Sequence, residues 1–245
     1  MNKLKSSDII TNKSLNPDGS FKVEFIYNNK ICPVSEITGK KANICSNNQI
    51  IIKDFQFLTS TLKTLIRINK EAKGNTSNPL KFDPSNDLHI ISANLLLSSV
   101  VTYCKCATPS NLRNERDTHS LYILDKLTPT QAETHKMLKT LRDKWVAHTD
   151  KNQLESSKTL FVFDPDRNQK PIFIHHASYG ASMEIQQLTE FLELVETTLK
   201  LFILKQKSDS ADLYRTELSE TNYKKAQKNA VTFLTYHKPK QTPKQ

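Results

Sequence analysis

The chain has 245 residues, of which 37% are hydrophobic and 24% are charged. This length accommodates one large domain, or one domain with an appendage, and the apolar content suffices for a core of several helices. There are only 4 glycines and no glycine-rich phosphate-binding string, which argues against a nucleotide-binding loop of that type. Low glycine content combined with apolar periodicity favours a mainly α-helical protein.

The formal net charge is +10, and such a field attracts polyanions: nucleic acid, an anionic membrane or an acidic partner. The alternative is that the lysines are spread over solvated faces and form no binding surface, which would give the same net charge. Part of the excess lies in the last 38 residues, at Lys224, Lys225, Lys228, Lys238, Lys240 and Lys244. We treat 208–245 as a basic C-terminal helix and tail that either contacts RNA by charge and stacking or is simply solvated.

The first residues, Met1 to Asp8, are polar and no apolar run follows them, so the sequence predicts no signal peptide. The longest apolar stretch, Ile90 to Val101, is shorter than the ~20 residues that span a bilayer. The four cysteines lack the local spacing of a zinc site and are expected to be free thiols; they are Cys32, Cys45, Cys104 and Cys106. We therefore expect a cytoplasmic protein without membrane contact, metal or cofactor.

Residues 1–47 are polar, and one segment of them has a strand pattern. Phe21 to Tyr27 alternates apolar and polar residues, Asn28 to Lys30 suits a turn, and Ile31 to Val34 is a candidate partner strand. The sequence predicts a weakly structured, β-containing N-terminal extension.

Two helices are predicted next, separated by a linker at residues 71–85. Apolar spacings of three and four indicate the first helix at Ile50 to Lys70. The second runs from about Ser85 to Cys104, with a predicted buried stripe at Leu88, Ile91, Leu95, Leu96, Val100 and Val101. After a charged loop, a short helix is expected from Ser120 to Leu127.

The string Thr128-Pro129-Thr130-Gln131 is a strong helix start, with Thr128 as the N-cap and Gln131 completing a capping box. This helix should continue through Thr140 toward Asp150. Its apolar stripe is Leu138, Leu141, Trp145 and His148.

Beyond residue 150, two short strands, Thr159 to Phe163 and Pro171 to Ile174, flank a turn at 164–169. A long helix follows from about Ser182 to Lys207, with an apolar face at Ile185, Leu188, Phe191, Leu192, Val195, Leu199 and Phe202. A further helix is predicted at Glu220 to Tyr236, then a disordered tail. We expect a helical bundle at 48–207 with a β-hairpin insert at about 159–174.

Arg142 and His148 are the right pair of residue types for metal-independent RNA cleavage. Histidine passes protons near neutral pH, and the arginine fork stabilises charge on phosphate oxygens. The spacing alone is weak, because Arg113 and His119 repeat it, and an ideal helix sets Arg142 and His148 about 120° apart. A half-buried, purely structural His148 near a helix C-terminus is the simpler alternative. Adjacent His175 and His176 read as a strand end rather than a metal site.

The longer string shifts the balance toward the functional interpretation. Leu141-Arg142-Asp143-Lys144-Trp145-Val146-Ala147-His148-Thr149-Asp150 resembles the signature of the HEPN superfamily, particularly its abortive-infection branch. In that signature an Arg, a polar residue and apolar residues lead into Ala-His-x-Asp at the end of a bundle helix. The resemblance covers about Ser85 to Gln153 and, less specifically, Ser182 to Lys207.

The resemblance implies an antiparallel HEPN-like bundle and a homodimeric, metal-independent endoribonuclease acting in phage defence or a toxin–antitoxin system. Arg142 and His148 would be catalytic, Lys144 would assist RNA binding, and Asp150 would orient His148. Asp143 stands where the family often has Asn, and an acid there suits a phosphate-binding Arg less well. An antitoxin protein is a further implied partner. The alternative is an inactive HEPN-like module that binds a protein or nucleotide.

Overall fold

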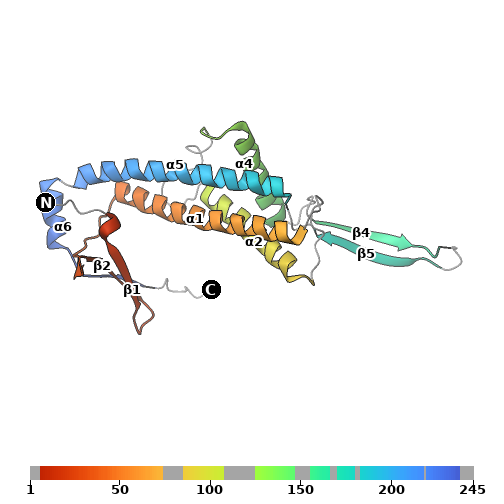
Figure 1. The fold of residues 1–245 in the computed structure, drawn as a ribbon, viewed down its shortest axis with the longest axis horizontal. Coiled ribbons are helices and arrows are strands. Elements are labelled where there is room, and N and C mark those ends of the chain that lie inside the picture. The colour runs from red at the N-terminus through yellow and green to blue at the C-terminus, as the bar shows by residue number, and fades with distance from the viewer. Residues whose placement is uncertain are drawn as a thin grey trace, which may run out of the picture. The chain divides into compact units, whose positions relative to one another are not determined.

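The computed structural model describes residues 6–73, 85–107, 125–146, 155–165, 170–179, 183–217 and 219–237. They belong to two compact units, one formed by 1–45 with 208–245 and the other by 46–207. Figure 1 shows the elements of both along the chain. The described residues are mainly α-helical, as the sequence predicts, and contain small antiparallel sheets.

The core of the 46–207 unit lies between four helices. They are α1 (Lys40–Lys73), α2 (Asp87–Ala107), α4 (Pro129–Leu141) and α5 (Ile185–Glu217). In α1 and α5 the fully buried rings of Phe55 and Phe202 stack with centroids 5.8 Å apart. Lys63 Nζ lies 2.9 Å from Glu196 Oε1, so the two helices run antiparallel. Helix α1 begins ten residues before the predicted Ile50.

Helix α2 also runs antiparallel to α1. Asn69 donates to Ser92 Oγ at 3.0 Å near one end of the contact, and Lys105 donates to Asp54 at 2.9 Å near the other. Between them the buried Tyr103 ring meets Phe55 edge-on. The register of α2 on α1 is thus fixed by apolar packing, one buried hydrogen bond and one exposed ion pair.

The predicted buried stripe of α2 is only partly right. Leu96 and Val100 are buried, whereas Leu88, Ile91 and Val101 are 41%, 45% and 42% exposed. Because α2 is apolar on all sides, periodicity could not single out its inner face. Small or hydrogen-bonded residues take the inner positions instead: Ser92, Ala93, Ser99, Tyr103, Cys104, Cys106 and Ala107.

By length and composition alone, α2 could cross a membrane, because an 18-residue window reaches a mean hydropathy of 1.4. The apolar run Ile90 to Val101 alone is too short to span a bilayer, as the sequence predicts. The helix that contains this run has 21 residues and is long enough. Half of that window is buried among the other helices. A core helix of a globular unit has the same composition, so this property is weak evidence for a membrane.

Helix α4 begins as the sequence predicts. The Thr128 hydroxyl accepts a hydrogen bond from the Gln131 backbone N–H at 3.3 Å, and Gln131 Oε1 accepts from the Thr128 backbone N–H at 3.1 Å. This reciprocal pair satisfies two N–H groups that a helix start leaves open. Gln131 Nε2 also donates to Thr197 on α5 at 3.0 Å, which ties the cap to the bundle.

Thr128→Ala is expected to lower the free energy of unfolding by about 1 kcal/mol, because the cap hydroxyl is lost. Urea denaturation followed by circular dichroism measures this change. Thr140→Ala is the matched control on the exposed side of α4, where the hydroxyl only bonds back to Lys136 O, and it should stay within about 0.5 kcal/mol. Equal effects of both substitutions would contradict the capping role.

The predicted hairpin is present and longer than expected. Its strands are β4 (Glu155–Val162) and β5 (Ile172–Tyr179), antiparallel, with Phe161 opposite Phe173. The residues just outside the predicted strands are mostly polar, so the apolar pattern did not show that the strands continue through them. Residues 166–169 of the predicted turn lie outside the described part.

The other unit contains a small sheet whose strands come from the N-terminal and the C-terminal parts of the chain. Strand β2 (Phe21–Tyr27) pairs with β1 (Ile10–Leu15), β3 (Lys30–Ile31) and β6 (Leu234–Tyr236). Asn28 and Asn29 have positive φ values of 48° and 60°, which suits the predicted β2–β3 turn. The N-terminal extension is thus a paired sheet, more ordered than predicted.

The predicted helix at Glu220 to Tyr236 is wrong in its second half. Helix α6 covers Glu220–Lys228 only, and β6 then pairs with β2. The β-branched and aromatic residues of 231–236 favour an extended strand when a partner edge is available. That partner lies some two hundred residues earlier, so no local pattern could reveal it. A short 3₁₀ helix, η1 (Ser6–Asp8), precedes β1.

Candidate functional site

The candidate site begins where α4 changes its winding. The α-helix ends at Leu141, and Arg142–Val146 form a π-helical turn, η3. The Arg142 backbone N–H points back to the carbonyls of Leu138 and Lys139. π-Helical turns are rare and often occur at functional sites. The ideal-helix angle between Arg142 and His148 therefore does not describe this segment.

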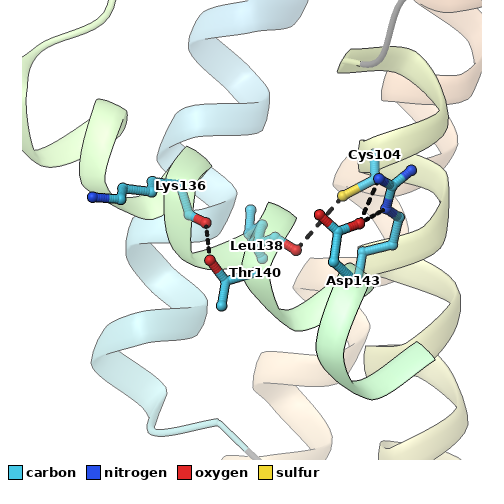
Figure 2. A network of polar contacts seen from close by, with 6 residues as sticks. Cys104, Lys136, Leu138, Thr140 and Asp143 are labelled. Atoms are coloured by element: carbon cyan, nitrogen blue, oxygen red, sulfur yellow. Dashed lines mark hydrogen bonds and ion pairs between the residues drawn. The ribbon is translucent and has the colours of Figure 1, made fainter. Parts of the chain in front are cut away.

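The face of α4 that leads into this turn packs on α2. Buried His135 and Leu138 precede Arg142 at helical spacing, so Arg142 leaves the helix on the side of α2. Figure 2 shows Leu138 and Asp143 beside Cys104 of α2. The backbone at the site is consequently anchored on the bundle core.

The Arg142 side chain is held by its neighbour. Its Nε donates to Asp143 Oδ1 at 2.7 Å, and Nη2 pairs with the same oxygen. The Arg142 side chain is 35% exposed and that of Asp143 is 52% exposed, so the pair faces solvent in part. One carboxylate oxygen thus occupies part of the fork that would grip a phosphate.

Cys104 lies beside this pair, and its thiol is unreactive. Its Sγ donates to Leu138 O at 3.6 Å (Figure 2). Burial raises the pKa of the Cys104 thiol to about 11, against a lowering by Arg142 and a further raising by Asp143. The thiol is therefore protonated at neutral pH and is a poor nucleophile. It serves as a packing and hydrogen-bonding group beside the arginine.

The structure brings together only part of the predicted site. Arg142 and Asp143 are in contact, and Lys144 follows them with its side chain exposed. The predicted proton-transfer residue, His148, and its predicted orienting residue, Asp150, lie outside the described residues. The same holds for the short helix predicted over Ser120 to Leu127, of which only the end is described, as a turn.

Sequence reasoning missed a buried polar pair two helical turns before Arg142. His135 Nδ1 lies 2.7 Å from the Tyr103 hydroxyl, and both side chains are buried. Burial lowers the pKa of His135, with a smaller contribution from Lys139. Neutral His135 therefore holds α4 to α2. The spacing of His135 to Leu138 places it on the apolar stripe, a signal that could have identified it.

This pair makes stability depend on pH. The folded pKa of His135 lies below its ordinary 6.5, so the folded state binds fewer protons and its stability falls as pH drops below 6.5 toward the folded pKa. Wild type should lose more unfolding free energy between about pH 7.5 and 5.5 than His135→Gln, which keeps a partner for Tyr103. Urea titrations at both pH values measure this, and equal losses in the two proteins would contradict it.

His175 and His176 are neighbours on β5, where His175 pairs with Thr159 and His176 with Lys158 of β4. His175 Nδ1 lies 3.0 Å from Thr159 Oγ1. Across the described ranges no three His, Cys, Asp or Glu side chains gather closely enough to hold a metal ion. The four cysteines are free thiols, as the sequence predicts.

Comparison with protein families, with curated proteins and with solved structures finds no match for this chain. The functional interpretation therefore depends on the residues around Arg142 and on the resemblance of their sequence.

Proposed function

We propose that this protein is a HEPN-like, metal-independent endoribonuclease of the cytoplasm, acting as a homodimer in phage defence or a toxin–antitoxin system. The observation that carries the proposal is the position of Arg142. It opens a π-helical turn at the end of the capped helix α4, its backbone N–H is directed to Leu138 O, which also accepts from buried Cys104, and its side chain is partly exposed. A partly exposed arginine at a helix end suits the binding of a phosphate.

The proposed chemistry needs one proton-transfer group and one phosphate-binding group. The ribose 2′-oxygen attacks the adjacent phosphorus, the bond to the 5′-oxygen breaks, and the products are a 2′,3′-cyclic phosphate and a 5′-hydroxyl. His148 transfers the proton, and Arg142 stabilises the charge that develops on the phosphate oxygens. Exposed Lys144 adds positive charge for RNA binding, and Asp150 orients His148.

The homodimer supplies a second set of the same residues. A two-fold axis near the end of α4 would place two arginines and two histidines around one groove. An antitoxin protein that covers this groove would silence the enzyme. The net charge of +10 supports a polyanionic substrate over a neutral one.

A second function is supported by one observation, the ion pair of Arg142 with Asp143. The carboxylate partly neutralises the guanidinium that would bind phosphate, as expected of a module that has lost catalysis. In this second proposal the protein is a silent HEPN-like module, and the same residues line an interface with a protein or nucleotide.

Asp143→Asn separates the two proposals. In a ribonuclease, the substitution frees the Arg142 fork and should raise RNA cleavage by up to about fivefold, since an exposed ion pair contributes up to ~1 kcal/mol. Asp212→Asn is the matched control, because Asp212 pairs with Arg215 at 3.2 Å outside the site and should change nothing. Initial cleavage rates of a fluorescent RNA measure the effect.

The direct test uses purified protein and total RNA in the presence of EDTA. Fragmentation that persists without divalent metal supports the ribonuclease. Intact RNA with wild type and with Asp143→Asn, both folded, would contradict it and favour the silent module.

A further inference from the structure

The β4–β5 hairpin carries large apolar side chains on both of its faces. One face presents three phenylalanines, Phe161, Phe163 and Phe173, which we call the aromatic face. The other presents Leu160, Val162, Ile172 and Ile174, which we call the aliphatic face. All seven side chains are 41–63% exposed. An isolated two-stranded hairpin is marginally stable in water, and pairing with further strands would stabilise it.

The amount of exposed apolar surface is that of an interface. At ~150–200 Å² for a large apolar side chain, half-exposed, the seven together offer on the order of 600 Å² per chain. A standard protein–protein interface uses about 800 Å² on each partner. Divided between the two faces, this is on the order of 300 Å² on each, the size of exposed apolar patches that are often functional.

One edge of the hairpin is open as well. Within the described part of the chain, β4 pairs with β5 and with no third strand. Strand β4 contains no proline, and Lys158 is the one charged residue between Ser156 and Val162. An edge of this kind is a template for pairing with another strand.

Two charged residues, one on either side of the apolar segment of β4, indicate that the strand pairing with this edge is β4 of a second copy of the chain. Lys158 lies three residues before Phe161, and Asp164 lies three residues after it. When two β4 strands pair antiparallel about a two-fold axis at Phe161, residues equally far from Phe161 face each other. Lys158 of one copy then faces Asp164 of the second copy, and the same contact occurs twice. Opposite charges directly across strands stabilise the pairing.

The same register matches the apolar residues. Leu160 falls opposite Val162 of the second copy, so each aliphatic face continues into a row of four aliphatic side chains. Phe161 meets its own copy at the axis, with Phe173 outside it on either side. Phe161 and Phe173 already lie 4.3 Å apart within one hairpin. A shift by one residue would place the aliphatic face of one copy on the same side of the sheet as the aromatic face of the other, and it would separate the charges.

We propose that β4 is a self-association edge, and that two copies of this chain join their hairpins antiparallel about Phe161 into one four-stranded sheet. Lys158 and Asp164 of the second copy set the register, and the apolar rows supply the attraction. This inference does not depend on the proposed ribonuclease, because self-association is measured without RNA. The axis at Phe161 defines a second interface, separate from the one proposed near the end of α4.

The register is tested first by cross-linking a mixture of ¹⁴N- and ¹⁵N-labelled protein with a zero-length carbodiimide. Lys158 and Asp164 of one chain are six strand residues apart, roughly 20 Å, so a link between them cannot form within one hairpin. A mixed-isotope Lys158–Asp164 peptide is the expected result. A monomeric wild type, or a dimer without this link, would overturn the proposal.

Charge reversal then tests specificity by sedimentation velocity. Lys158→Glu and Asp164→Lys should each raise the dissociation constant about tenfold, because each turns two attractive pairs into repulsive ones. The double variant Lys158→Glu/Asp164→Lys, and an equimolar mixture of the two single variants, should both return to within about threefold of wild type. Lys136→Glu, on exposed α4 surface, is the matched control and should change nothing.

Two outcomes would overturn the proposal at this stage. One is failure of the double variant and the mixture to restore association. The other is unchanged association accompanied by weaker binding of a single-stranded oligonucleotide, measured by fluorescence anisotropy. That second result would assign the aromatic face to base stacking.

Discussion

His148→Ala is expected to slow RNA cleavage in EDTA by roughly 10²- to 10⁴-fold, the usual contribution of a general acid or base. In the proposed reaction the histidine moves the proton of the 2′-hydroxyl or of the leaving oxygen, and alanine cannot. Initial rates on a fluorescent RNA measure the loss. His175→Ala removes an exposed histidine from the hairpin and serves as the control, which should keep wild-type activity.

The chain's fold should survive this substitution. Circular dichroism and urea unfolding of His148→Ala should match wild type to within about 1 kcal/mol, the size of a helix-end contribution. A variant that cleaves normally, or one that loses cleavage only because it unfolds, would contradict the catalytic role. A changed melting temperature with unchanged cleavage would indicate that His148 has a structural role only.

Phe55→Ala is expected to cost about 3–5 kcal/mol of unfolding free energy. Phe55 is fully buried at the meeting of three helices, where it stacks on Phe202 and meets Tyr103 edge-on. Removing the ring leaves a cavity that rigid helices cannot close. Urea denaturation monitored by circular dichroism measures the change.

Phe57→Ala, two residues away on the same helix, is the matched control. Phe57 is 66% exposed, so its loss should change the free energy of unfolding by no more than about 0.5 kcal/mol. Comparable losses from Phe55→Ala and Phe57→Ala would mean that α1 does not bury the face described above.

The sequence predicts those elements whose stabilising contacts lie within a short stretch of the chain. The capping box of Thr128 and Gln131 is confirmed because both of its hydrogen bonds lie within four residues. The β2 strand and the β4–β5 hairpin are confirmed for a related reason, since an alternating pattern identifies β2 and two short apolar runs around a polar turn identify the hairpin.

Elements that depend on distant partners were not predictable in the same way. Strand β6 exists because β2 offers an edge, and nothing near residues 234–236 in the sequence identifies that distant partner. The inner face of α2 is set by hydrogen bonds such as Asn69 to Ser92, which an apolar-all-round helix does not reveal. Both are decided by tertiary contacts rather than by periodicity.

The same distinction between local and tertiary contacts holds for the candidate site. Arg142 and Asp143 could be singled out from the motif, but their mutual ion pair could not, because it depends on side-chain conformations at a π-helical turn. The His135–Tyr103 pair needs two helices to meet before it exists. The relation of Arg142 to His148 stays a prediction.

The ends of the cut RNA test the central claim most directly. Wild type and the Arg142→Ala/His148→Ala double variant are incubated with total RNA in EDTA, and the new termini are mapped. The ribonuclease proposal predicts 2′,3′-cyclic phosphate and 5′-hydroxyl ends from wild type and none from the double variant. Intact RNA with wild type, or identical cleavage by both proteins, would contradict it.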